Sequence, residues 1–232
     1  MSRLCSLIGL MALLVSWTIQ PALAAPEGEF IATRMWQQER VVASPTLWIS
    51  EISGPGMPEP YREESPIAEV VEPTRGIPGR VVLGPLPDRM EPFEVLWFTR
   101  EGPEAIRLFR DRRQYPDLEA ARQASAPSGP FTRFWSAARF AELSALPALE
   151  KPDRTGLLAL MREALPRIPK GSTVSTLNEV LEDLMIEKGL NPFSSRQTFA
   201  QARRGLEKDP EIQALIEEIK GRIRQDASEP EG

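Results

Sequence analysis

Basic side chains that could bind an anion are concentrated in one stretch. Five arginines lie within fourteen residues, namely Arg100, Arg107, Arg110, Arg112 and Arg113. On a helix, Arg107 and Arg110 share a face that Arg113 extends, so Arg100, Arg107, Arg110 and Arg113 are candidate binding residues. Such a ladder could hold the carboxylates or phosphates of an anionic glycan, a lipid headgroup or an acidic protein. The alternative is a solvated face whose ion pairs contribute about 0–1 kcal/mol each.

Carboxylates in the same stretch could support hydrolysis. The acids Glu94, Glu101, Glu104 and Asp111 lie close together in the sequence. A glycosidase needs two carboxyl groups about 5–10 Å apart on either side of the bond. Any acidic chain offers such pairs, and Glu104 is also explained by a helix N-terminus. A carboxylate-dependent hydrolase of envelope polymers is therefore an alternative function, and no catalytic residue is predicted.

The last predicted helix, which opens at Asp209, carries one apolar stripe. Its candidate binding residues are Ile212, Ile216, Ile219 and Ile223. Helices that dock in a partner's groove use the same i, i+3, i+4, i+7 spacing. The competing interpretation is a face that packs on its own domain, because buried aliphatic side chains stabilise a fold by about 1.5–3 kcal/mol each.

Two residue types that dominate metal and nucleophilic chemistry are almost missing. The chain has no histidine and one cysteine, Cys5. If Cys5 leaves with a signal peptide, the mature chain has neither imidazole nor thiolate, which excludes disulfides and Ser-His-Asp or Cys-His catalysis. Zinc or copper sites built on those ligands are excluded as well. We therefore expect no metal and no cofactor.

The first 25 residues have the pattern of a signal peptide. Arg3 supplies a positive start, residues 4–17 are almost unbroken apolar sequence, and Ala22-Leu23-Ala24 offers a cleavage site. The apolar run is shorter than the roughly 20 residues that span a membrane. We expect a periplasmic or secreted protein that has no transmembrane segment after signal cleavage.

The rest of the chain predicts an α+β protein with a small Pro-rich β-unit followed by a bundle of about five or six short helices. Residues 26–115 form the β-rich unit, with strand candidates at residues 30–36, 40–43, 46–52, 67–71, 80–83 and 93–99. The proline density between them argues against a wide, regular sheet. A rival interpretation is that residues 26–92 are an arm that orders only on a partner.

A strand–helix junction is predicted to end the β-unit. Ala105, Leu108 and Phe109 recur at helical spacing after Pro103, which suits a first helical position. The helical unit, residues 116–225, has further helices predicted at residues 117–124, 131–146, 154–165, 176–188, from 195 and from 210. The acidic tail, residues 226–232, is expected to be disordered.

The leading functional hypothesis is an exported, non-enzymatic interaction or assembly protein. It follows mainly by elimination, because the sequence shows no catalytic constellation. The partner would be another protein or an anionic envelope component, and no nucleic acid is expected at a net charge of −5. The alternatives are the hydrolase above and a carrier of a small ligand between the two halves of the chain. The sequence leaves the oligomeric state undetermined.

The signal-peptide pattern makes a prediction about the mature N-terminus. Cleavage behind Ala22-Leu23-Ala24 should leave Ala25 or Pro26 as the first residue. The intact mass of protein recovered from the periplasm checks this expectation. A mass that still includes Cys5 would indicate an anchored protein instead.

Overall fold

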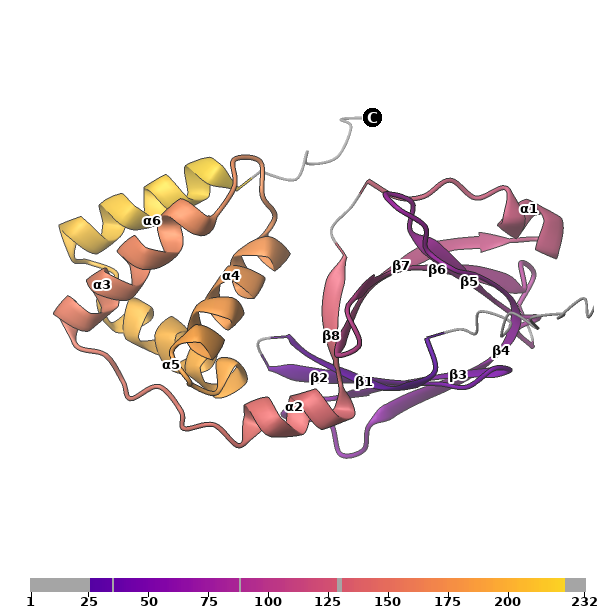
Figure 1. Ribbon diagram of the computed structural model, residues 1–232, viewed down its shortest axis with the longest axis horizontal. Coiled ribbons are helices and arrows are strands. Elements are labelled where there is room, and N and C mark those ends of the chain that lie inside the picture. Colours follow the sequence, from indigo (N-terminus) through magenta and orange to yellow (C-terminus); the bar gives the residue numbers. More distant parts are fainter. Residues whose placement is uncertain (1–25, 35, 88, 129–130, 224–232) are drawn as a thin grey trace, which may run out of the picture.

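A closed antiparallel barrel of eight strands forms the first half of the structure (Figure 1). The computed structural model describes residues 26–34, 36–87, 89–128 and 131–223. The strands follow one another around the barrel in chain order: β1 (Gly28–Arg34), β2 (Gln37–Ala43), β3 (Leu47–Ser53), β4 (Tyr61–Val71), β5 (Gly79–Leu83), β6 (Phe93–Glu101), β7 (Ala105–Tyr115) and β8 (Thr132–Ser136). Closure comes from β1 and β8, where Phe30 pairs with Ser136 and Ile31 with Trp135.

Side chains fill the interior of the barrel. Successive residues of a strand point to opposite faces, so every second residue contributes to the core. Phe98 and Phe134 are 0% and 2% exposed. The buried core consists of Phe30, Ala32, Val41, Ala43, Trp48, Val81, Leu83, Leu96, Phe98, Ile106, Leu108 and Phe134. An eight-stranded barrel is just wide enough for side chains to fill it, and this one is a packed scaffold.

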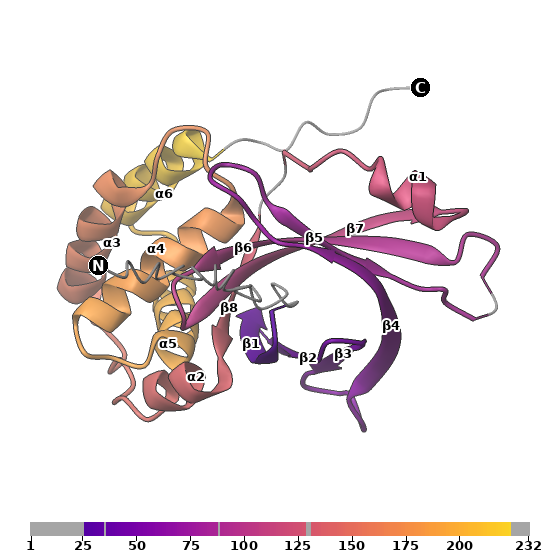
Figure 2. The same ribbon diagram turned by 45° about the vertical axis from the view of Figure 1, so that its right-hand side comes forward.

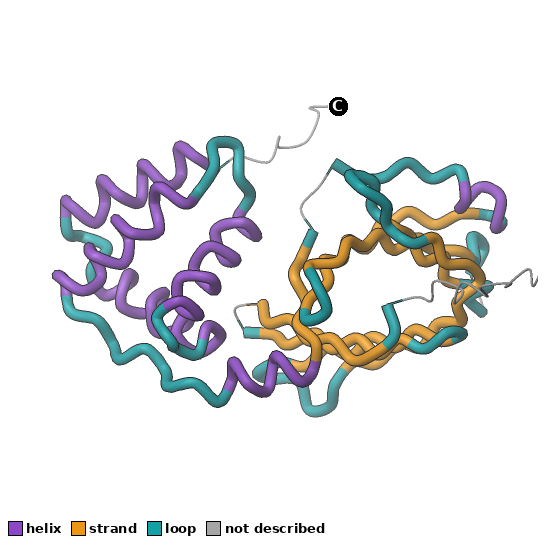
Figure 3. Tube along the Cα trace, viewed as in Figure 1, coloured by secondary structure: helices purple, strands orange, loops and turns teal. Residues whose placement is uncertain are grey.

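The helices lie outside the barrel (Figure 3). The short α1 (Leu118–Arg122) covers the outer face of β5, β6 and β7, where Ala121 packs on Val82, Val95 and Trp97. After β8 the chain continues through α2 (Ala137–Ser144) into a separate group of four helices beside the barrel (Figure 2). These are α3 (Arg154–Ala164, continued by the 3₁₀ turn Leu165–Arg167), α4 (Val174–Glu187), α5 (Pro192–Gly205) and α6 (Pro210–Arg222). They share a second buried core, which includes Leu157, Leu184, Met185 and Ile212.

The prediction of an α+β protein with a small Pro-rich β-unit and a helical bundle is wrong. The strands close into a barrel, and the longest, β4 and β7, have 11 residues each. Proline does not prevent this sheet because most prolines lie in the connections, such as residues 54–60 and 85–87. Pro66 is the exception inside a strand, and its carbonyl still accepts from the Gly84 N–H at 2.8 Å.

The predicted helix after Pro103 is also wrong, because residues 105–115 form strand β7. Gly102 has φ +68°, in the left-handed region that favours glycine, and it starts the tight turn from β6 into β7. Ile106 and Leu108 then face the barrel core, while Phe109 packs on the outer cluster beneath α1. Because this stretch has apolar residues on both faces, its sequence fits the period of a helix as well as that of a strand. Pairing with β6 makes it a strand.

Residues 131–146 were predicted as one helix and are divided in the structure. Residues Thr132–Ser136 form β8, the strand that closes the barrel, and only Ala137–Ser144 are helical. The predicted helix starts at Asp153 and Asp209 are confirmed, since both side chains accept backbone N–H groups as N-caps. Helix α4 begins earlier than predicted, because Thr173 rather than Thr176 is its N-cap.

The terminal predictions lie outside the described residues. These are the signal peptide over residues 1–25 with Cys5, and the acidic tail over residues 226–232. Across the part of the chain that the structure describes, none of the helices combines the length and apolar character needed to cross a membrane.

Removing one core aromatic should test the packed barrel. Phe98→Ala leaves a cavity in the fully buried core and should lower the free energy of unfolding by about 3–5 kcal/mol. Denaturant unfolding monitored by circular dichroism measures this loss. The control is Tyr61→Ala, because Tyr61 is 57% exposed and its loss should change stability by about 0.5 kcal/mol or less. Equal effects of the two substitutions would contradict a filled barrel interior.

Candidate binding sites

A set of ion pairs joins the barrel to the group of four helices. We call it the α4 joint, and it consists of Glu101, Arg107, Arg133, Glu179, Glu182, Asp183 and Arg196. From β8, Arg133 binds Asp183 of α4 at 2.7 Å and Glu101 of β6 at 2.8 Å. From β7, Arg107 binds Glu179 of α4 at 2.8 Å and also pairs with Glu101. One face of α4 therefore docks on arginines of the barrel wall.

Arg196 of α5 is the most buried arginine of the joint. Its residue is 7% exposed, and Nη1 donates to the Glu182 carboxylate at 2.8 Å. Nη2 donates to the Thr33 carbonyl oxygen of β1 at 2.7 Å. This single guanidinium group thus links α4, α5 and the barrel. Replacing one partner of such a buried pair leaves an uncompensated charge, which is strongly destabilising.

Two carboxyl groups of the joint hold their protons more tightly than usual. Burial raises the pKa of Glu182 to about 7, although the charge of Arg196 opposes the shift. Burial also raises the pKa of Glu179, against the attraction of Arg107 and Arg133. Perturbed carboxyl groups often mark functional sites, but they arise in structural ion-pair networks as well. Here both groups take part in holding α4 against the barrel.

The structure separates the four arginines that the sequence suggested as a ligand ladder. Arg100 pairs with Glu72, and Arg113 pairs with Asp111 of its own strand at 2.7 Å. Arg107 belongs to the α4 joint, while Arg110 points to the interior side of β7. Because β7 is a strand and each of these arginines binds a carboxylate of the chain, they form no common ladder. Their role in ligand binding remains a prediction without geometric support.

Arg110 belongs to a cluster at one end of the barrel core. It contacts Glu94 and Glu63 at 2.9 Å each, and Arg89 binds Glu63 at 3.0 Å and also pairs with Glu94. Glu94 is 5% exposed. Despite its burial, the hydrogen bonds and charges of Arg110 and Arg89 lower the pKa of Glu94. The other carboxylates considered for hydrolysis are ion-paired as well, Glu101 with Arg107 and Arg133, Glu104 with Arg139, and Asp111 with Arg113.

An apolar groove opens between the helices of the second group, with a volume of about 270 Å³. We call it the helical groove. Its lining residues are Met161 and Ala164 of α3, Val174, Leu177, Asn178 and Leu181 of α4, Arg196, Gln197, Phe199, Ala200 and Arg203 of α5, and Ile216, Ile219, Lys220 and Ile223 at α6. Val174, at its edge, is 60% exposed. Together with the half-buried Leu177, Ala200 and Ile219, Val174 extends the apolar lining of the groove to the protein surface.

The isoleucine stripe of α6 packs on the helical core, and its half-buried members also line the helical groove: Ile216 and Ile219 do both. Ile212 is fully buried in the helical core. Ile216, Ile219 and Ile223 are half-buried and line the groove. The sequence identified this face, but it missed the contributions of α4 and α5, such as Leu177 and Ala200. Their signal was present as further apolar residues at helical spacing.

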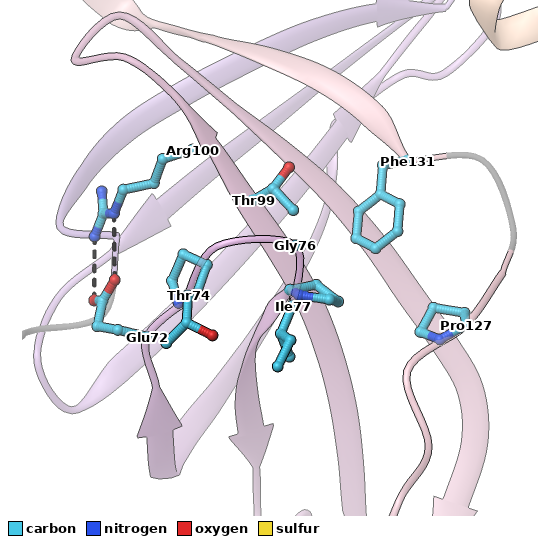
Figure 4. Close-up of a pocket in the computed structure, with 10 residues that line it drawn as sticks. Glu72, Thr74, Gly76, Ile77, Thr99, Arg100, Pro127 and Phe131 are labelled. Atoms are coloured by element: carbon cyan, nitrogen blue, oxygen red, sulfur yellow. Dashed lines mark hydrogen bonds and ion pairs between the residues drawn. The ribbon is translucent and has the colours of Figure 1, made fainter.

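A second hollow lies at the rim of the barrel (Figure 4). It is formed by the turn from β4 into β5, by Thr99 and Arg100 of β6, and by the side chains of Pro127 and Phe131. Figure 4 shows the ion pair of Arg100 with Glu72 at one side and Ile77 between the walls. The volume of this hollow is about 670 Å³. The charges here are already paired, so the hollow offers less specific chemistry than the helical groove.

The described residues show no group of three or more His, Cys, Asp or Glu side chains placed to hold a metal ion. No family model, curated protein or solved structure matches the chain. Any functional assignment must therefore come from the geometry of the sites themselves.

Replacement of Glu182 should change how stability depends on pH. Its native pKa of about 7 exceeds the unfolded value of 4.5, so the native state binds its proton more tightly. This stabilisation is present below pH 4.5 and is lost as the pH rises through 7. Glu182→Gln cannot titrate, so its free energy of unfolding relative to wild type should rise by on the order of 2 kcal/mol between pH 5 and pH 8. The loss of the carboxylate that faces Arg196 adds a destabilisation to the variant, and the change of the difference with pH is the quantity that tests the titration.

Unfolding free energies of both proteins across this pH range provide the measurement. The variant Glu217→Gln, at an exposed position of α6, controls for the loss of one carboxylate. A stability difference between Glu182→Gln and wild type that stays constant from pH 5 to pH 8 would show that Glu182 does not titrate in this window.

Proposed function

We propose that this protein is a non-enzymatic binding module that receives an apolar helix of a partner protein in the helical groove. The length of the groove is the observation that carries the proposal. Helix α4 lines it from Val174 to Leu181, α5 from Arg196 to Arg203, and α6 from Ile216 to Ile223. Each helix therefore lines the groove over an interval of i to i+7, about 10 Å at 1.5 Å per residue.

A docked helix presents its anchor side chains over the same distance. Recognition of a helix in a groove uses apolar anchors at i, i+3 or i+4, and i+7, which also span about 10 Å. Ala200 is half-buried, and its small side chain leaves room along the wall formed by α5. Met161 and Ala164, 1% and 2% exposed, belong to the helical core and form the floor of the groove. The lining thus supports a row of two or three aliphatic anchors.

The alternatives have less support. At about 270 Å³ the groove lies just below the roughly 300–1,000 Å³ of typical small-molecule sites. The rim hollow, at about 670 Å³, falls within that range, but its Arg100 and Glu72 already pair with each other, which leaves a small-ligand carrier with less support. The carboxylates considered for hydrolysis lie in ion pairs, for example Glu101 with Arg133 and Asp111 with Arg113. Export to the periplasm or cell exterior remains a prediction from the N-terminal sequence.

Photo-crosslinking from the edge of the groove tests this function. A photoreactive phenylalanine analogue at Val174, 60% exposed, should give a discrete adduct with a partner protein in the cells that produce the chain. Ala200→Phe fills the groove and should reduce this adduct at least tenfold without preventing folding, a loss of about 1.4 kcal/mol in binding free energy or more. Mass spectrometry should place the crosslink in an amphipathic helix.

Two controls separate groove binding from general effects. Ala214→Phe adds the same side chain at an exposed position of α6 outside the groove, and the adduct should persist. The same analogue at Tyr61, on the barrel, should give no such adduct. Crosslinking from Val174 that is insensitive to Ala200→Phe would rule out the groove as the binding site.

A further inference from the structure

We propose that the helix received by the helical groove is acidic, with carboxylates beside its apolar anchors that pair with Arg203 and Lys220. This inference rests on the proposed function and adds the chemistry of the partner. It starts from the charges that line the groove. All of them are cationic, namely Arg196, Arg203 and Lys220, and no acidic residue is among the described lining residues.

The three cations differ in how far their charge is already balanced. Arg196 is satisfied by Glu182 and by the Thr33 carbonyl oxygen. Arg203 is exposed and makes no ion pair within the part of the chain that the structure describes. Arg203 is therefore the cation with charge left for a partner.

Lys220 of α6 adds a second available charge to the lining. Its contact is with Glu217, three residues earlier on α6, at 2.7 Å. Both side chains are more than 60% exposed, and an exposed pair of this kind contributes about 0–1 kcal/mol. A carboxylate docked in the groove can therefore compete for Lys220. Arg203 and Lys220 then offer one cation from α5 and one from α6 beside the apolar lining.

This local basic character contrasts with the whole chain, whose net charge is −5. Long-range attraction would favour basic partners, so a preference for acidic ones must arise at the groove itself. Cations beside an apolar groove select among amphipathic helices by the charges that flank their anchors, because like charges brought together weaken binding.

Two synthetic helical peptides of about 18 residues, long enough to populate a helix alone, provide the probe. Both carry leucine anchors at i, i+3 and i+7, and they differ only in flanking Glu or Lys residues. Fluorescence anisotropy with the full chain should show about tenfold tighter binding of the Glu peptide, and added salt should reduce this preference. Arg203→Glu should abolish or reverse the preference.

Matched variants make the outcomes distinguishable. Arg204→Glu changes the neighbouring exposed arginine, which does not line the groove, and should keep the tenfold ratio. Equal binding of both peptides, lost in Ala200→Phe, would leave the groove as a helix site and overturn the acidic preference. Binding of neither peptide would overturn both proposals.

Two further measurements test other occupants of the groove. Decanoate that binds the chain while neither peptide does would identify an acyl-carboxylate site and overturn the proposal. Sedimentation that shows a dimer which Ala200→Phe dissociates would identify a second copy of this chain as the occupant, and would likewise overturn it.

Discussion

The ion pairs of the α4 joint are the interaction on which the rest of the structure depends. Arg133 and Arg107 of the barrel wall meet Asp183 and Glu179 on one face of α4. These charged groups occur in pairs because burial removes them from water, and a buried charge without its partner is strongly destabilising. The other side of α4 lines the helical groove. Arg196 lines the groove and also pairs with Glu182 in the joint. The side chains of the joint therefore fix the position of the groove relative to the barrel.

The two halves of the protein differ in how completely they bury their apolar side chains. Packed side chains such as Phe98 and Phe134 fill the barrel interior, and the Glu94 cluster closes one end of it. The barrel is therefore a scaffold. The helical group buries its own core but leaves apolar side chains half-exposed along the groove. Fold does not determine function, so the proposed binding role depends on this groove and its charges.

Local sequence signals predicted local structure well. The N-caps at Asp153 and Asp209 act through hydrogen bonds to the next turn, and they formed as expected. Strand β6 is also where its apolar run predicted a buried strand. Two predicted helices proved to be the strands β7 and β8, because Phe109 and Phe134 fit a helical period as well as a strand face. Pairing with distant strands outweighs such weak local preferences.

The sequence by itself determined the residue chemistry, the caps and the apolar face of α6, because these depend on side-chain type and on neighbours a few residues apart. It could not reveal that the strands close into a barrel, since the pairing of β1 with β8 joins residues about a hundred positions apart. For the same reason it could not place Arg107 against Glu179, or bring Val174, Ala200 and Ile219 together in one groove. Tertiary structure decided both, because long-range pairing and helix packing select among conformations that the local sequence leaves nearly equal in free energy.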